Sequence, residues 1–257
     1  MSHERELPLL PGAYELTIVP RVACVLDEAA RRAAMGADEG TLLWAGEQHA
    51  ARTRRGHAWY APAGNLHCAL VLRPDYDTRV GQQIATVAGV AAGAAIAEVV
   101  APMTGMGFRW PGDLLVNELL AGRITLAAGP AVDDTWPWLV VAVSVNVAHH
   151  PENPEPECYN SIHASGESDH VRVVDVLELF ARHFLRWLSI WSQQGYAPVR
   201  GAWMQRARDV GQPRRLELGG RVLSGTTRGI GELGELVLDT GADRPQRVSV
   251  AEYFALS

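Results

Sequence analysis

Apolar positions recur along the chain at two spacings, and each spacing predicts one class of secondary structure. Between residues 174 and 194 apolar side chains return every three or four positions, which predicts a long helix with one buried face. A shorter amphipathic helix is expected at 27–35, where four alanines can pack closely. Short apolar runs predict buried strands at 41–44, 66–72 and 138–147. Helices and strands are therefore mixed.

The apolar segment 84–100 is rich in Ala, Val and Gly and could be mistaken for a membrane span. It is barely long enough to cross a bilayer, and its small side chains are only weakly hydrophobic. Glu98 lies near its end, just before Pro102. We therefore expect a buried core helix and no membrane association.

A turn followed by a hairpin is expected near the middle of the chain. Residues 108–113 have the composition of a turn, and two apolar strands follow at 114–116 and 119–126. Only Asn117 and Glu118 lie between these strands, and a two-residue connection is typical of a β-hairpin.

The pattern changes near residue 212, where long apolar segments give way to short strands and glycine turns. Such spacing is typical of a small all-β module. We therefore predict two domains, 1–206 and 207–257. The strands expected in the second domain are 214–218, 221–227, 236–239 and 247–250.

Charge and cysteine content narrow the class of protein. A formal net charge of −6 argues against nucleic acid as the main partner, because phosphate binding normally requires a basic surface. Three widely spaced cysteines favour reduced thiols in the cytoplasm over a disulfide framework. The first twelve residues lack the pattern of a secretory signal.

The strongest candidate for chemistry is the Arg-rich stretch within residues 48–62. It contains Arg52, Arg54 and Arg55, and guanidinium groups bind phosphate or carboxylate oxygens bidentately. The alternative interpretation is a solvated charge run on the surface. The flanking apolar strands and the nearby Trp59 favour an anion site.

Three further groups of residues also allow a functional and a structural interpretation. Arg109, Trp110 and Asp113 share one turn, and the arginine should keep the carboxylate ionised; alternatively this is a surface ion pair beside a core tryptophan. Asn146 ends an apolar strand, where its amide could bind a base or ribose or simply cap a turn. Cys158 and His163 fall short of a zinc pattern, so no metal ligand is assigned.

Together these segments resemble the biotin–protein ligase family, whose catalytic domain carries a loop of the form Gly-Arg-Gly-Arg-Arg-Gly-Arg-x-Trp. Residues 51–59, Ala-Arg-Thr-Arg-Arg-Gly-His-Ala-Trp, match it. Residues 109–113, Arg-Trp-Pro-Gly-Asp, match the family's Lys-Trp-Pro-Asn-Asp. The likeness runs in order along nearly the whole chain. It also includes residues 62–66, Leu120-Ala121-Gly122, residues 194–198 and Arg228-Gly229-Ile230.

The resemblance implies a fold and a reaction. The fold is α+β, a mixed sheet with packed helices, followed by a small SH3-like β-barrel and without an N-terminal DNA-binding domain. In the reaction ATP and biotin give biotinyl-adenylate, with Mg²⁺ assisting, and a lysine of a biotin carboxyl carrier domain then takes the acyl group. Relatives often pair through sheet edges, so a homodimer is one expected assembly.

The resemblance also implies roles for individual residues. Gln48 and Arg52 are expected to bind the acid, Trp110 and Asn146 to contact the nucleotide, and Asp113 to orient or deprotonate the lysine amine. The predicted catalytic residues are Arg54, Arg109, Asp113 and Arg123, and the predicted binding residues are Gln48, Arg52, Arg55, Gly56, Trp59, Trp110, Gly122 and Asn146.

Several positions depart from the family pattern and leave alternatives open. Leu119 replaces the family's lysine before Leu-Ala-Gly, and Arg123, four residues along the same strand, would share its face if pairing is regular. Ala142 and Ser144 replace glycines, and their side chains could narrow the site. Residues 26–29, followed by Gly40-Thr41-Leu42, are more like the lipoate ligases and octanoyltransferases of the same fold superfamily. A lipoate or octanoate enzyme and a ligand-binding protein without turnover are therefore the alternatives.

Overall fold

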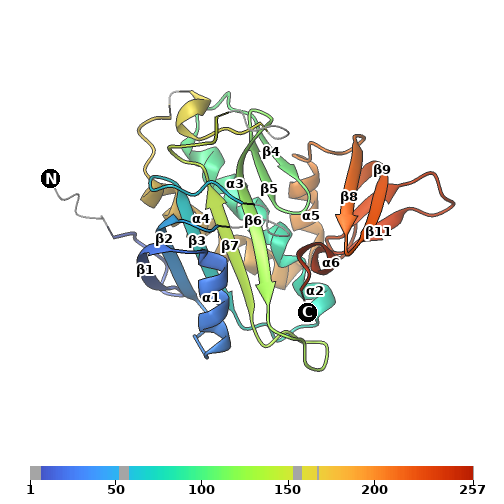
Figure 1. Ribbon diagram of the computed structural model, residues 1–257, viewed down its shortest axis with the longest axis horizontal. Helices are drawn as coiled ribbons and strands as arrows, with labels where there is room; N and C mark the ends of the chain where they lie inside the picture. Colours follow the sequence, from blue (N-terminus) through green and yellow to red (C-terminus); the bar gives the residue numbers. More distant parts are fainter. Residues whose placement is uncertain (1–6, 52–57, 153–157, 167, 257) are drawn as a thin grey trace.

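The computed structural model describes residues 7–51, 58–152, 158–166 and 168–256. Its larger part is a seven-stranded sheet in the order β1-β2-β3-β7-β6-β5-β4 (Figure 1). β1 runs parallel to β2, and every other neighbouring pair is antiparallel, so the sheet is mixed as predicted. The strands are β1 Glu15–Val22, β2 Thr41–Gln48, β3 Leu66–Leu72, β4 Met106–Arg109, β5 Asp113–Val116, β6 Leu119–Ala128 and β7 Leu139–Val145.

Helices bury both faces of this sheet. Along β3 the side chains alternate: Leu66, Cys68 and Leu70 belong to the main core, whereas Ala69 and Val71 pack with the alanines of α1 on the other face. Strands buried on both sides read as continuous apolar runs, as β3 does. The helices are α1 Val25–Ala34, α2 Thr78–Gly81, α3 Ile84–Val99, α4 Val173–Gln194, α5 Ala197–Met204 and α6 Val250–Phe254.

The Ala-rich helix α3 is the centre of the main core. Twelve of its 16 residues are buried, and it packs against α4 and α5. The apolar stretch Thr78–Val99 is long enough to cross a membrane by length and composition, but 83% of its most apolar window is buried within the protein. The prediction of a core helix is confirmed.

Several elements differ from the prediction. Residues 106–109 form strand β4, paired with β5, and the turn is confined to residues 110–112. β2 extends through Gln48, well beyond Trp44. The last predicted strand, 247–250, ends at Val248 and gives way to α6, because the Ser249 hydroxyl accepts a hydrogen bond from the Glu252 N–H and caps that helix.

The hairpin prediction is confirmed in its turn but not in its regularity. Asn117 and Glu118 both have positive φ, 50° and 66°, as a two-residue primed turn requires. The β5–β6 register then shifts between Leu114 and Leu115, which is a β-bulge. Side chains of β6 before and after the bulge therefore do not alternate regularly.

The C-terminal residues form a separate antiparallel sheet in the order β11-β10-β9-β8, at the right of Figure 1. Among the described residues its pairing is that of an open four-stranded sheet. It is anchored to the larger part: Gln82 Oε1 accepts the Val250 N–H at 2.9 Å, and the Trp110 indole donates to the Gly234 carbonyl at 2.8 Å. The strands are β8 Pro213–Leu218, β9 Arg221–Ile230, β10 Leu236–Asp239 and β11 Gln246–Val248.

His67 is a titratable side chain fully buried within β3. Its Nε2 lies 3.3 Å from the Pro62 carbonyl, and its Nδ1 has no hydrogen-bond partner. Burial lowers the pKa of His67 from 6.5 to about 4, although the Pro62 carbonyl opposes the shift. The folded protein therefore holds this imidazole neutral at pH values where the unfolded chain has already bound a proton.

We predict that His67 makes the fold sensitive to mild acid. Its contribution to stability is complete above the unfolded pKa of about 6.5 and is lost as the pH falls towards 4. The loss should approach about 3 kcal/mol, because one pKa unit corresponds to about 1.4 kcal/mol. Urea unfolding of the His67→Gln variant between pH 7 and pH 4 should lack this component. His170→Gln, an exposed control, should follow the wild type; identical curves for all three proteins would contradict the prediction.

Candidate active site

One row of paired residues crosses five strands of the large sheet. Arg109 of β4 lies opposite Asp113 of β5, which lies opposite Arg123 of β6. Arg123 lies opposite Ser144 of β7, and Ser144 lies opposite His67 of β3. Directly paired residues project from the same face of a sheet. The register therefore gathers four polar or charged groups around Arg123 on one face.

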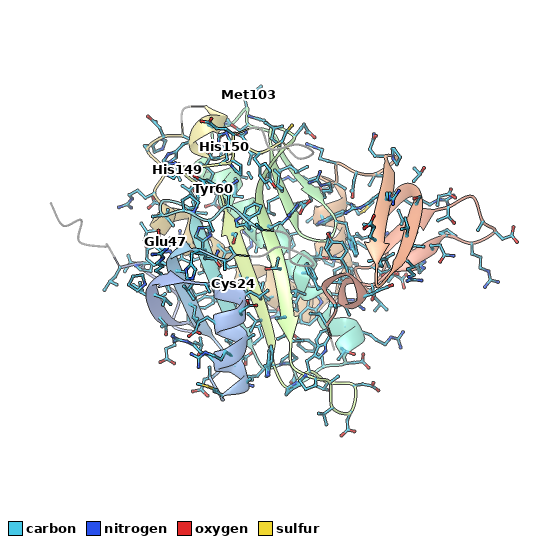
Figure 2. The ribbon with its side chains drawn as sticks, in the orientation of Figure 1. Cys24, Glu47, Tyr60, Met103, His149 and His150 are labelled. Carbon is cyan, nitrogen blue, oxygen red and sulfur yellow. The ribbon has the colours of Figure 1, made fainter. Side chains whose placement is uncertain are left out.

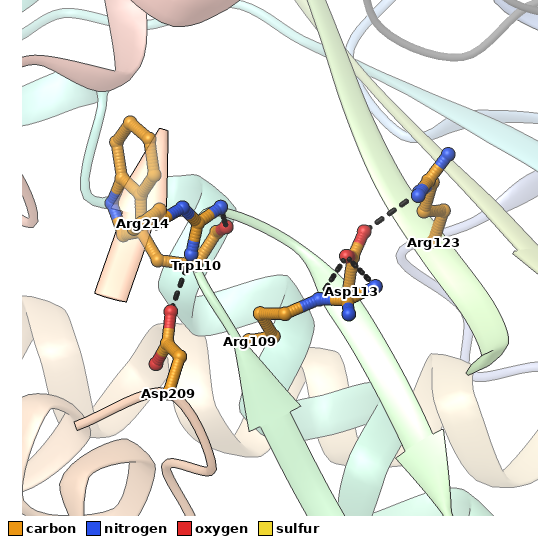
Figure 3. A network of polar contacts seen from close by, with 6 residues as sticks. All are labelled: Arg109, Trp110, Asp113, Arg123, Asp209 and Arg214. Carbon is orange, nitrogen blue, oxygen red and sulfur yellow. Dashed lines mark hydrogen bonds and ion pairs between the residues drawn. The ribbon is translucent and has the colours of Figure 1, made fainter. Parts of the chain in front are cut away.

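Asp113 is held between two guanidinium groups (Figure 3). Arg123 Nε donates to its Oδ1 at 2.7 Å, and Arg109 donates to Oδ2 from Nε and Nη2, both at 2.8 Å. Asp113 and Arg123 are each only 9% exposed. Burial alone would raise the pKa of the Asp113 carboxyl, but the charges of Arg123 and Arg109 outweigh it and hold that pKa below its usual value. The carboxylate is ionised at neutral pH.

Trp59 brings the base of the Arg-rich segment to this row. The backbone N–H of Trp59 donates to the Ala51 carbonyl at 2.9 Å, which joins the two ends of the segment. The Arg123 guanidinium carbon lies 5.6 Å from the centre of a Trp59 ring. The predicted residues Arg52, Arg54, Arg55 and Gly56 lie outside the described residues. Their flanking residue Trp59 nevertheless lies beside the Asp113–Arg123 pair.

The indole N–H of Trp59 lacks a hydrogen-bond acceptor. The residue is 6% exposed, and its buried Nε1 has no hydrogen-bond partner. It packs with Leu115 and Leu120, and Tyr159 meets its ring edge-on at 6.0 Å. A buried donor without an acceptor costs free energy.

Gln48 is used structurally at the end of β2. Its Oε1 accepts the Val25 N–H at 2.7 Å at the start of α1, and the residue is 9% exposed. This contact fixes the position of α1 against the sheet. The carbonyl oxygen of Gln48 is therefore already occupied, and binding of the acid by Gln48 stays a prediction for its amide nitrogen.

Asn146 organises a loop, and its predicted contact with a nucleotide stays a prediction. It is fully buried, and its Nδ2 donates to the Asn160 carbonyl at 3.1 Å. Its Oδ1 faces the amide of Asn65 at 3.4 Å. Asn65 Oδ1 in turn accepts the backbone N–H groups of residues 147, 148 and 149. The two asparagines thus fix the course of the chain after β7.

Trp110 and Gly122 also have structural roles, and their predicted ligand contacts stay predictions. Trp110 is 1% exposed, and Tyr253 packs edge-on against it at 4.9 Å, so its indole is part of the core. A Cβ added at Gly122 would lie 2.8 Å from the Ser144 carbonyl and 3.1 Å from Leu114. The glycine permits close strand packing in the core.

Two clefts lie among the described residues, and residues of this row line the first of them. One of about 420 Å³ lies between the β4–β5 edge and the C-terminal sheet. The other, of about 470 Å³, lies beside Tyr60, His149 and His150, which gather at one end of the sheet (Figure 2). The first cleft is lined by Arg109, Asp113, Leu115, Glu118, Arg208, Asp209, Gln212, Pro213, Arg214 and Arg215.

The sequence profile of the biotin/lipoate A/B protein ligase family matches residues 10–205. The chain belongs to this family. A biotin–[acetyl-CoA-carboxylase] ligase from Paracoccus denitrificans is 33% identical over 231 residues, which cover 88% of this chain and 94% of that protein. One from Mycobacterium tuberculosis is 29% identical, covering 90% and 85% of the two chains.

Solved structures share the fold of this family member. Biotin protein ligase from Aquifex aeolicus in complex with biotin and ATP superposes with a TM-score of 0.73, at 20% identity, over 92% of this chain and 96% of that one. A biotin protein ligase-like protein of unknown function from Silicibacter superposes with a TM-score of 0.76, at 24% identity, over 95% and 97%.

The bulge in β6 corrects the prediction that Arg123 shares a face with Leu119 in this family member. Leu119 pairs with Val116, a residue of the main core, whereas Leu120 pairs with Leu115 and both pack against Trp59. Since paired side chains project together, Leu120, and not Leu119, lies on the face of Arg123. Regular pairing therefore gives no support to Arg123 as a substitute for the family's lysine.

The sequence did not predict that His67 belongs to this row, or that Ser144 pairs with Arg123 on the neighbouring strand. Both lie in apolar runs that predict buried strands, and neither belongs to a motif. The available signal was a histidine in an otherwise apolar strand. Only the strand order, which pairs β3 and β6 with β7, brings these residues into one row.

We predict that Asp113→Asn lowers the free energy of unfolding by about 3 kcal/mol, because removing one partner leaves buried charge uncompensated. Arg109→Met should cost less than Asp113→Asn. It removes the outer partner of Asp113, whose side chain is 34% exposed, and keeps the inner partner Arg123, whose side chain is 10% exposed. Urea unfolding at pH 7 measures both. Glu217→Gln, at an exposed ion pair with Arg215, is the control and should change little. An Asp113→Asn variant as stable as this control would refute the buried network.

Proposed function

We propose that this protein is a biotin–protein ligase that activates biotin with ATP and attaches it to a lysine of a carboxyl carrier domain. The observation that carries the proposal is the 33% identity, across 88% of the chain, to a ligase named for this reaction. The Aquifex ligase that shares the fold binds biotin and ATP. Both substrates are assigned to the present chain by this proposal.

The first half-reaction joins the acid to the nucleotide. A carboxylate oxygen of biotin attacks the α-phosphorus of ATP, the bond to pyrophosphate breaks, and a mixed anhydride with AMP remains. Negative charge builds up around phosphorus, and positive groups fixed nearby stabilise it. We assign this role to Arg52, Arg54 and Arg55, with the acid on the face that carries Arg123, Ser144 and His67.

The second half-reaction passes the acyl group to the carrier. The lysine amine attacks the acyl carbon, the bond to AMP breaks, and an amide forms as the nitrogen loses its proton. Asp113 is suited to orient that amine. Because the neighbouring arginines keep its pKa below the usual range, Asp113 is a weak proton acceptor, and a positioning role fits it better than deprotonation.

Mg²⁺ is assigned to the nucleotide and not to a protein cage. Among the described residues no group of three or more His, Cys, Asp or Glu side chains is placed to hold a metal ion. Asp113 is already paired with two arginines. Mg²⁺ commonly binds through phosphate oxygens and water with few protein ligands, and it would supply charge neutralisation there.

Three further assignments belong to the proposal. Cys24, Cys68 and Cys158 are free thiols, which favours a reducing compartment such as the cytoplasm. The family likeness favours an SH3-like arrangement of the C-terminal sheet. A homodimer would use an edge of the large sheet, where β1 and β4 are the outer strands.

One specific observation favours a second candidate, a binding protein without turnover. Leu119 stands where the family has a lysine, and the bulge separates its face from that of Arg123. A cation expected beside the acyl carboxylate is therefore replaced by an apolar side chain. Lipoate and octanoate remain the alternative acids, because lipoate ligases belong to the same family profile.

We predict that the protein exchanges labelled pyrophosphate into ATP in the presence of biotin. The same assay with lipoate and octanoate identifies the acid, since only the activated one supports exchange. Calorimetry with each acid is the companion measurement. Binding of an acid without exchange would contradict the ligase and support the binding protein, and a Leu119→Lys variant that gains exchange would identify the missing cation as the cause.

We predict that Arg54→Ala reduces exchange by about 100-fold, as loss of one fixed group at a developing charge typically does. The matched control is Arg182→Ala, which removes an exposed arginine from α4. Initial rates at saturating ATP and biotin measure the effect. Equal rates in the two variants would remove the Arg-rich segment from the mechanism.

A further inference from the structure

The turn that leads into Asp113 is held by a side chain from the C-terminal sheet. Arg214 of β8 donates through Nη2 to the backbone carbonyl of Trp110 and through Nη1 to the carboxylate of Asp209 (Figure 3). Its guanidinium carbon lies 5.8 Å from the centre of a Trp110 ring. One planar fork therefore binds the turn and a second anchor at the same time.

The Arg214–Asp209 ion pair is largely buried. The two side chains are 12% and 8% exposed, and Asp209 Oδ1 is buried without a hydrogen-bond partner. Burial raises the pKa of Asp209, although the charge of Arg214 opposes that shift. Burying such a pair is costly unless its geometry is well satisfied. Here the geometry directs the second Arg214 nitrogen to the Trp110 carbonyl.

The turn transmits its position to the strand that carries Arg123. Gly112 follows Trp110 and Pro111, and its carbonyl accepts the Ile124 N–H at 2.8 Å. A Cβ at Gly112 would lie 2.7 Å from the Ile124 carbonyl oxygen, so the turn fits closely against β6. A displacement of the Trp110 carbonyl would therefore move Asp113 relative to its partner Arg123.

We propose that Arg214, fixed by Asp209, is a positioning residue that sets the placement of Asp113 for acyl transfer to the acceptor lysine. The inference rests on the proposed ligase function and extends it, because it makes the C-terminal sheet part of the second half-reaction. Arg214 touches no reacting group and acts through the Trp110 turn. The first half-reaction, assigned to the Arg-rich segment, does not depend on it.

Contacts other than those of Arg214 attach the C-terminal sheet to the larger part of the protein. Gln82 binds the start of α6, Trp110 donates to Gly234, and Arg200 Nε donates to the Ile230 carbonyl at 2.7 Å. None of these three contacts includes Arg214. A selective effect of Arg214 on transfer therefore separates positioning from general stability.

The test compares Arg214→Lys with Arg228→Lys in the full chain. Lysine keeps the charge beside Asp209 but has one nitrogen, so it cannot span the two acceptors of the planar fork. Arg228 pairs with Asp239 in the same C-terminal sheet, away from the turn. Asp209→Asn is a second variant, which keeps Arg214 but weakens its anchor.

We predict that Arg214→Lys slows single-turnover transfer from preformed biotinyl-adenylate to a carrier domain by about 10-fold to 100-fold, because a misplacement of about 1 Å can cost about 100-fold. Pyrophosphate exchange should stay within about twofold of the wild type, since a residue serving one step leaves the other intact. Asp209→Asn should also slow the transfer step. Arg228→Lys should change neither step.

Hydrogen exchange of the peptide spanning residues 108–116 gives a readout that needs no activity. The amide hydrogens of this peptide should exchange faster in Arg214→Lys than in the wild type. Their exchange rate should be unchanged in Arg228→Lys. The proposal would be overturned if hydrogen exchange of this peptide were unchanged in Arg214→Lys. It would also be overturned if this variant lost both half-reactions equally. If the wild type activates none of the three acids, the ligase function fails, and the hydrogen-exchange comparison still decides whether Arg214 holds the turn.

Discussion

The pairing register of β4, β5 and β6 is the constraint on which the site depends. It sets one carboxylate between two guanidinium groups, and all three must project from the same face. A slip of one residue in β5 would turn Asp113 to the opposite face and leave Arg123 buried without it. The primed turn at Asn117 and Glu118, the bulge in β6 and the fit of Gly112 against Ile124 together hold that register.

The same arrangement gives an acidic protein a local positive charge. Two guanidinium groups and one carboxylate leave a surplus of one positive charge in the row, although the chain carries a formal net charge of −6. Apolar neighbours such as Leu115 and Leu120 exclude water from part of this site, which strengthens electrostatic attraction.

Periodicity along the chain predicted α3, α4, β3 and the hairpin turn, because each is governed by burial or by local turn geometry. The turn motif at residues 109–113 identified Asp113 and its partner Arg109, which are close in sequence. The role of Trp110 could not be predicted, since its partners Gly234 and Tyr253 lie more than a hundred residues away. Nor could the row through Ser144 and His67, because strand order and the bulge in β6 arise from tertiary packing.

The burial of Trp110 beneath the C-terminal sheet bears on how independent the two parts are. Its indole is covered from one side by residues of the last fifty, and Gln82 caps a helix that begins at Val250. A fragment ending near residue 206 would expose this tryptophan to water and deprive Gln82 Oε1 of the hydrogen bond that it accepts from the Val250 N–H. The change of architecture near residue 212 therefore does not mark a point where the chain can be cut into autonomous pieces, and the two sheets should melt as one cooperative unit.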